Sequence, residues 1–174
     1  MKIEDIRELC KEAHENAVRH GFWDEEHDIR HYLMLVITEL AEAVQAYRKD
    51  RFAKHEEFRR LVDEGCTDGS AYLIAYKDTF EDEMADACIR LMDLAGQGYA
   101  VLMDHFVFED LAEQEITVTL FKAIFFMQNM MNHIGELVMY FIRLSEAIGI
   151  DIEWHIRQKM AYNASRPYLH GNKF

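Results

Sequence analysis

The scarcity of helix-breaking residues constrains the fold of this chain more than any other feature. Its 174 residues include a single proline, Pro167, and only eight glycines, while half of the residues are apolar. Apolar side chains recur three or four positions apart through most of the sequence, the spacing that places them on one side of a helix. We therefore predict an all-α fold, a helical bundle forming one domain over residues 1–174.

Interruptions of the apolar pattern predict where the helices end. Residues 24–28 hold candidate N-caps for a second helix, and Gly149 followed by Asp151 separates the last two helices. Weaker breaks are expected near residues 78–79 and near Gly135. The predicted helices cover approximately residues 3–18, 29–49, 51–64, 71–95, 106–148 in two pieces, and 151–166.

The net charge bears on the partners that the chain can bind. Asp and Glu number 32 against 19 Lys and Arg, which gives a formal charge of −13. A nucleic-acid polymer or an anionic membrane is not expected as a partner, because a long phosphate surface would be repelled. A small phosphorylated ligand stays compatible with this charge if metal ions bridge it to the protein.

Cysteine usage favours a reducing, cytoplasmic location. The three cysteines are widely spaced and form no CxxC motif, so neither a disulfide framework nor a zinc knuckle is indicated. The N-terminus lacks the uninterrupted apolar core of a signal peptide. Charged residues also interrupt the most apolar region, 116–150, too often for a membrane span.

Two acidic pairs on strongly helical segments are the main candidates for chemistry. Glu39 and Glu42 are three residues apart, as are Glu83 and Asp86, so each pair lies on one face of its helix. Four carboxylates that converge would suit a divalent cation, which prefers hard oxygen ligands.

Apolar neighbours on both helices indicate that these carboxylates face protein. Ala43 and Ala46 lie beside the two glutamates, and a polar stripe on the second helix runs between apolar borders. Buried carboxylates require a cation or a basic side chain. The alternative, that they belong to solvated helix faces, stays open at this point. The stripe consists of Glu83, Asp86, Arg90 and Asp93.

The predicted C-terminal helix offers complementary groups. Lys159, Asn163 and Arg166 follow the i, i+4, i+7 spacing and share one face if the helix continues that far. Such a face would present two cations and an amide to a phosphate or a base. A solvated basic helix end, favoured by the helix dipole, explains the same residues.

Three stretches in a fixed order resemble the MazG-like branch of the all-α nucleoside triphosphate pyrophosphohydrolase superfamily. They are GFWDEE…HYLMLVITELAEAVQAYRKD, then FEDEMADACIRLMDLAG, then IGIDIEWHIRQKMAYNASRPYLHGNKF. The resemblance covers roughly residues 20–50, 77–98 and 146–174. It implies a house-cleaning type of enzyme that cleaves a (d)NTP to (d)NMP and pyrophosphate in the cytoplasm.

The resemblance also implies the metal and the catalytic residues. Mg²⁺, with Mn²⁺ as a substitute, would be held by Glu39, Glu42, Glu83 and Asp86, and would neutralise and align the phosphates. Either Glu39 or Glu42 would orient the attacking water as general base, and the sequence does not distinguish between them.

Further residues are carried over to the nucleotide site by the same resemblance. Lys159, Asn163 and Arg166 would contact the nucleotide, and Trp23 would lie near its base, although a Trp before a helix also serves as a core anchor. Arg90 and Asp93 would contact phosphate or support the metal ligands, with a salt bridge between helices as the alternative.

One part of the chain has no counterpart in the resemblance. Residues 99–145 form a helical insertion between the second acidic helix and the C-terminal helix, and the connection 43–82 is longer than in compact members. The insertion carries Phe121 and Phe125 among a run of Phe and Met at helical spacing, which suits a core or the interface of a homodimer or higher homo-oligomer.

Two other classes of protein fit part of the pattern. A ferritin-like di-metal protein would carry Glu-x-x-His on two helices, whereas Asp24/His27 and Asp28/His31 carry Asp and share one segment. The His27-Asp28 dipeptide alone is weak evidence for an HD-type phosphohydrolase. A non-catalytic nucleotide-binding protein on the same fold would be expected to lack some of the four carboxylates, which are all present here.

Overall fold

The computed structural model describes every residue except 99, 103–110, 114 and 172–174. The described part contains helices and no strand, as the sequence predicts, and no helix in it combines the length and apolarity needed to cross a membrane. The helices are α1 (Ile3–Arg19), α2 (Ile29–Arg48), α3 (His55–Asp63), α4 (Asp68–Ala75), α5 (Phe80–Gly96), α6 (Ile116–Asn129), α7 (Ile134–Ala147), α8 (Ile152–Ala164) and the 3₁₀ turn η2 (Tyr168–Gly171).

Side-chain caps explain several of the boundaries. Asp28 accepts a hydrogen bond from the backbone of Arg30 and begins α2, and Asp151 does the same for α8 through Trp154. Thr79 caps α5 by accepting from the backbone N–H of Asp82. This cap confirms the break predicted near residues 78–79, because it separates α4 from α5.

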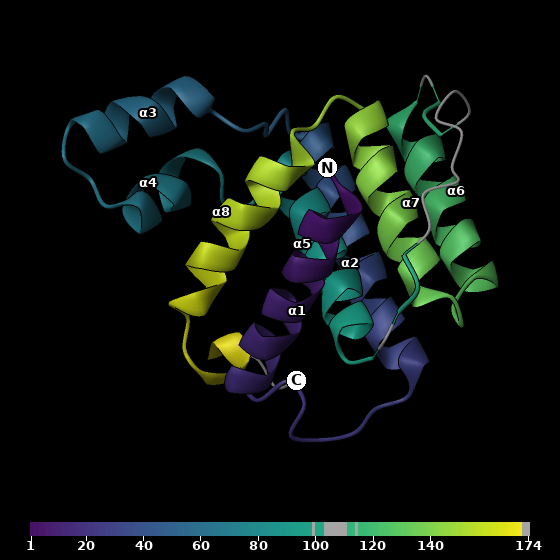
Figure 1. The fold of residues 1–174 in the computed structure, drawn as a ribbon. Coiled ribbons are helices and arrows are strands. Elements are labelled where there is room, and N and C mark those ends of the chain that lie inside the picture. The colour runs from purple at the N-terminus through teal and green to yellow at the C-terminus, as the bar shows by residue number, and fades with distance from the viewer. Residues whose placement is uncertain (99, 103–110, 114, 172–174) are drawn as a thin grey trace.

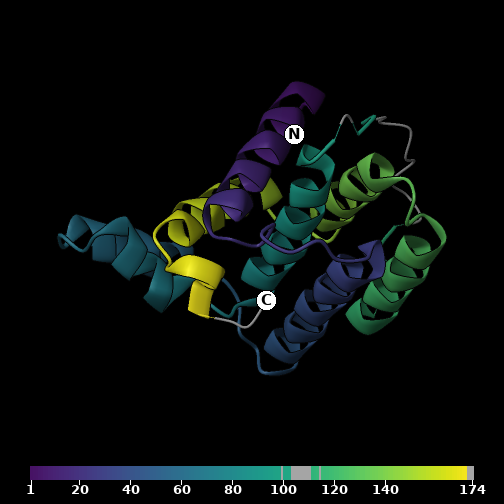
Figure 2. The same cartoon turned by 90° about the horizontal axis from the view of Figure 1, so that it is seen from below.

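Helix α5 lies at the centre of the bundle. Figures 1 and 2 show α1, α2, α7 and α8 arranged around it, and α5 contacts all four. Most of its residues are accordingly buried, and these include the acidic side chains of Asp82 and Glu83. One apolar stripe at helical spacing is buried along its whole length and consists of Phe80, Met84, Ala87, Leu91 and Leu94.

Close backbone approach fixes the crossing of α1 and α5. A Cβ added at Gly96 would lie 2.2 Å from the carbonyl oxygen of Cys10, so only glycine permits this contact. A similar approach occurs at Gly135, where a Cβ would lie 2.3 Å from the carbonyl oxygen of Val101. Gly135 lies inside α7, which begins at Ile134, so the break predicted near it falls slightly earlier, at residues 130–133.

The predicted helical region 106–148 is confirmed as two helices, α6 and α7, over most of its length. Its first residues, 106–110, and residue 114 lie outside the described residues. Helix α6 packs against α2, and Phe126 of α6 stacks on Tyr140 of α7 with ring centroids 4.2 Å apart. Phe121 and Phe125 of the same helix are 70% and 64% exposed.

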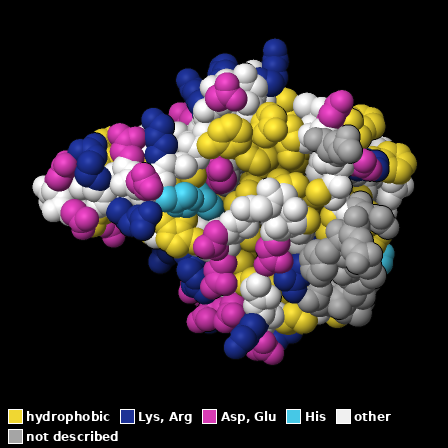
Figure 3. Space-filling view, turned by 90° about the horizontal axis from the view of Figure 1, so that it is seen from above, with side chains coloured by type: hydrophobic (Ala, Val, Ile, Leu, Met, Phe, Trp, Pro, Cys, Tyr) yellow, Lys and Arg dark blue, Asp and Glu magenta, His cyan; other side chains and the backbone are white. Residues whose placement is uncertain are grey.

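Helices α3 and α4 form an arm, residues 55–75, that projects from one side of the bundle (Figure 1). The base of the arm is closed by two backbone hydrogen bonds, Phe80 N–H to Arg51 O at 2.9 Å and Lys54 N–H to Ala75 O at 3.1 Å. Charged side chains of both signs cover the arm in Figure 3. Aromatic contacts join the arm to α8, including Tyr72 stacked on Tyr162 with centroids 4.8 Å apart.

Candidate functional site

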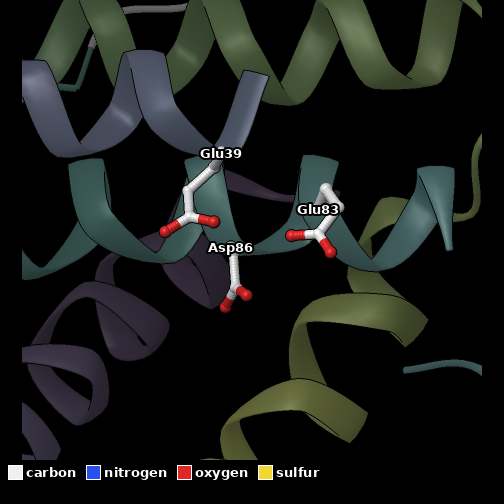
Figure 4. A group of neighbouring side chains, drawn as sticks. All are labelled: Glu39, Glu83 and Asp86. Carbon is white, nitrogen blue, oxygen red and sulfur yellow. The ribbon is translucent and has the colours of Figure 1, made fainter. Parts of the chain in front are cut away.

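Three carboxylates from two helices meet beside α8. Glu39 projects from α2, Glu83 and Asp86 project from α5, and the three carboxylates extend to the same side of these helices (Figure 4). One oxygen from each side chain lies within 4.8 Å of the other two. We call Glu39, Glu83 and Asp86 the carboxylate cluster. The packing of α2 against α5 brings Glu39 next to two acids that are 44 or more positions later in the sequence. A single ion at this place could contact all three carboxylates.

Burial makes this cluster electrostatically unusual. Glu39 and Glu83 are each only 5% exposed. Burial, followed by the neighbouring charge of Asp86, raises the pKa of the Glu83 carboxyl to about 9. The same two causes raise the pKa of Glu39, although Arg90 opposes them. In addition, Glu83 has neither a hydrogen-bond nor an ion-pair partner among the described residues.

Two basic side chains partly compensate these charges. Arg90 donates from Nε to Glu39 Oε1 at 2.6 Å. Lys159, from α8, places its Nζ 2.6 Å from Asp86 Oδ2 and 2.8 Å from Asp82 Oδ2. Burial alone would lower the pKa of an ammonium, but Asp86 and Asp82 raise the pKa of Lys159 well above its ordinary value. Lys159 is therefore a permanent cation beside the cluster.

Asp82 belongs to this network and was not among the residues predicted from the sequence. It is 1% exposed, and it also accepts hydrogen bonds from the Tyr72 hydroxyl and from the Asp78 backbone N–H. A sequence signal existed in its i, i+4 spacing to Asp86. The contact with Lys159, 77 residues away, depends on how α8 packs against α5.

Glu42 lies outside the carboxylate cluster. The prediction that both glutamates of α2 face protein is confirmed for Glu39 and wrong for Glu42, which is exposed one turn further along the helix. Glu42 and Glu83 line a surface hollow of about 150 Å³ together with Lys49 and Arg51. Asp78 is a second exposed carboxylate in this lining, so the hollow places two accessible acids and two basic residues next to the buried Glu83.

Lys159, Asn163 and Arg166 do not all lie on one face of a helix, contrary to what the sequence suggests. Lys159 and Asn163 are buried in α8, and the Asn163 Oδ1 atom has no hydrogen-bond partner among the described residues. Helix α8 ends at Ala164, so Arg166 lies beyond it, where it donates to the His170 carbonyl oxygen at 3.2 Å. Lys159 and Asn163 share the predicted face, and Arg166 does not.

Trp23 and Asp93 contact each other at the other end of α5. The Trp23 indole N–H donates to Asp93 Oδ1 at 2.9 Å, and the His14 ring bonds the same oxygen at 2.8 Å. The indole also stacks on Tyr32 with centroids 4.9 Å apart. Through these contacts Trp23 anchors the α1–α2 connection to α5. Asp93 is its hydrogen-bond partner on α5.

His170 is a second residue that the sequence did not indicate, and its ring packs against His20 and Phe22. Its Nε2 atom is buried without a hydrogen-bond partner among the described residues. Burial and the charge of Arg166 lower the pKa of His170 to about 4, so its ring is neutral at neutral pH. Leu169 and His170 both have positive φ angles, 47° and 51°, which hold this turn in a strained conformation.

The composition of the site fits a divalent cation. Four carboxyl groups, those of Glu39, Asp82, Glu83 and Asp86, lie with only two cations, Arg90 and Lys159, so the acidic groups outnumber the basic ones by two. Carboxylate oxygens are the ligands that Mg²⁺ and Mn²⁺ prefer.

The residues of the ferritin-like alternative lie elsewhere. Asp28 caps α2 and pairs with Arg30, and His27 stacks on His31. None of them belongs to the carboxylate cluster, which contains no His among the described residues.

Comparisons with known protein families, with curated proteins and with solved structures found no match to this chain. The geometry of the site is therefore the basis for any functional assignment.

Proposed function

We propose that this chain is a Mg²⁺-dependent nucleotide pyrophosphohydrolase that cleaves a nucleoside triphosphate to a monophosphate and pyrophosphate. One observation carries the proposal: the three sequence stretches that resemble MazG-like enzymes meet at one site. Glu39 comes from the first stretch, Glu83 and Asp86 from the second, and Lys159 from the third. If these acids belonged only to solvated helix faces, residues from the three stretches would not be expected to meet at one place.

Glu39, Glu83 and Asp86 would hold the metal. A bound Mg²⁺ supplies charge neutralisation for the triphosphate and acidifies a coordinated water. The unpartnered, 95% buried Glu83 supports this assignment, because an isolated buried carboxylate is costly unless a cation joins it.

Glu42 is the better candidate for the general base. It is exposed beside the cluster and has no hydrogen-bond or ion-pair partner among the described residues, so its carboxylate is available to a water molecule. Glu39 is engaged by Arg90. Lys49 and Arg51 line the same hollow and would contact the phosphate chain. Asn163, whose Oδ1 is buried without a partner among the described residues, would accept a hydrogen bond from the nucleotide.

The experiment is a pyrophosphate-release assay over a panel of canonical and modified nucleoside triphosphates with Mg²⁺. We expect turnover of at least one of them by the wild-type protein, and its loss by more than about 100-fold in Glu39→Gln. Glu56→Gln makes the same change on the exposed side of α3 and should retain wild-type activity. Nucleotide binding without turnover would instead support a non-catalytic nucleotide-binding protein, and equal activity of Glu39→Gln would overturn the assignment of the site.

We also propose that the chain forms a homodimer or higher homo-oligomer in the cytoplasm. Val118, Phe121 and Phe125 are exposed along one side of α6, and apolar side chains grouped in this way favour association. Light scattering on the wild type and on Phe121→Glu tests the oligomeric state, with a smaller solution mass expected for the variant. A monomeric wild type at micromolar concentration would contradict it.

The proposed cytoplasmic location rests on the free cysteines, which support a reducing compartment.

A further inference from the structure

Lys159 is placed where it competes with a metal ion. Its Nζ lies 2.6 Å from Asp86 Oδ2, and Asp86 is a member of the carboxylate cluster. The side chain of Lys159 is 6% exposed, so its ammonium has almost no access to bulk water. Its charge therefore acts on Asp86 with little screening by solvent.

Asp82, one helical turn before Asp86 on α5, is a second acceptor for the Lys159 ammonium. Its Oδ2 accepts from Lys159 Nζ at 2.8 Å and from the Asp78 N–H at 3.1 Å, while its Oδ1 accepts from the Tyr72 hydroxyl. Both carboxylate oxygens are thus occupied by protein donors. Asp82 is outside the carboxylate cluster and is engaged as a partner of Lys159.

We infer that Lys159 is a resident cation of the site, that it opposes metal binding at Asp86, and that Asp82 is the positioning residue that limits this opposition. The inference rests on the proposed metal-binding role of the cluster. When the metal takes Asp86, the ammonium keeps Asp82 as a partner, so it need not be left unpaired in the interior. The Asp82–Lys159 pair would then set the affinity of the site for the metal.

Opposite effects of two charge-removing variants test the inference. Lys159→Met removes the competing cation and should tighten Mn²⁺ binding by about tenfold or more. Asp82→Asn leaves Lys159 with Asp86 alone and should weaken Mn²⁺ binding by about tenfold or more. Free Mn²⁺ is measured by electron paramagnetic resonance on the full chain without nucleotide.

Tyr72→Phe is the matched control. It removes a hydrogen bond from the same carboxylate without changing any charge, so Mn²⁺ affinity should stay within about threefold of wild type. Without Lys159 there is no cation for Asp82 to hold, so the double variant Asp82→Asn/Lys159→Met should bind Mn²⁺ within about threefold of Lys159→Met, whereas a value midway between the single variants would show a direct charge effect of Asp82 and overturn its positioning role. Two single variants that weaken binding alike, or that leave it unchanged, would overturn the inference.

A measurement on the wild type keeps the inference testable if a single variant does not fold. The ¹⁵N signal of the Lys159 ammonium should shift when Mg²⁺ is added, because its partner Asp86 becomes engaged. An unchanged signal at saturating Mg²⁺ would overturn the inference. Failure of the wild type to bind any metal would remove the proposed function as well, whereas metal binding with an unresponsive Lys159 would leave that function intact.

Discussion

Arg90 Nε lies 2.6 Å from Glu39 Oε1, and this contact joins α5 to α2 beside the carboxylate cluster. The side chain of Glu39 is 7% exposed and that of Arg90 is 36% exposed. Arg90 is therefore the counter-ion of a buried acid.

Arg90→Gln should lower the free energy of unfolding by about 1–2 kcal/mol in EDTA, since it leaves Glu39 without its charged partner near a partly exposed surface. The loss should shrink when Mg²⁺ is present, because the metal replaces the guanidinium as the counter-ion of Glu39. Urea unfolding with and without Mg²⁺ measures both values.

The control for this variant is Arg60→Gln, which breaks an exposed pair with Glu64 on α3. Its effect should stay within about 0.5 kcal/mol and should not depend on Mg²⁺. An equal loss for Arg90→Gln in both conditions would argue that no metal reaches Glu39.

Glu83 gives the metal-free protein an unusual pH dependence. Its pKa is about 9 in the folded state and 4.5 as the ordinary value, so between these two pH values the folded chain retains a proton that the unfolded chain has released. The contribution of Glu83 to stability is therefore complete below pH 4.5 and is lost as pH rises toward 9, by at most about 1.4 kcal/mol per pH unit.

Glu83→Gln should flatten that part of the stability profile relative to wild type, and saturating Mg²⁺ should do the same by favouring the ionised carboxylate. Thermal unfolding from pH 5 to pH 9 in EDTA provides the comparison, with Glu56→Gln as the control that keeps the wild-type slope. Identical slopes for wild type and Glu83→Gln would refute the prediction.

Substitution of Glu39 and of Glu42 should have different effects on metal binding and on pyrophosphate release. Glu39 belongs to the carboxylate cluster and Glu42 does not. Glu39→Gln should weaken Mn²⁺ binding by about tenfold or more, while Glu42→Gln should keep it within about threefold and still lower pyrophosphate release by about 100-fold. Unchanged turnover in Glu42→Gln would transfer the role of base to another residue.

Two glycines in helices should respond to alanine with opposite signs. Gly96→Ala should destabilise the protein by about 2 kcal/mol or more, because the added methyl group meets the Cys10 carbonyl oxygen at the crossing of α1 and α5. Gly69→Ala, in α4, meets no atom within 4 Å and should stabilise by about 0.5–1 kcal/mol through helix propensity. Differential scanning calorimetry of both variants distinguishes packing from propensity.

Local chemistry allowed most helix boundaries to be predicted from the sequence. Asp151 caps α8 and Gly149 adopts φ +89° before it, because a capping oxygen and a positive φ act within a few residues. The break before Gly135 was predicted about three residues late. There the glycine accommodates the backbone of Val101, a tertiary contact that periodicity does not contain.

The candidate site was predictable only in part for the same reason. Helical spacing placed Glu83 and Asp86 together, and it treated Glu39 and Glu42 as equivalent although one is buried and the other exposed. That difference depends on the angle at which α2 meets α5. The bond between Lys159 and Asp82 likewise depends on the packing of α8, which no spacing within one helix can reveal.

The arm offers a position from which the site can be observed without being altered. Cys10 and Cys88 are buried, and burial raises the pKa of each thiol to about 12, so both are poor nucleophiles. Cys66, in the connection between α3 and α4, is the more accessible thiol. A maleimide fluorophore would therefore attach to the arm selectively, and its emission would report any movement of the arm when Tyr72 and Asp82 respond to a ligand.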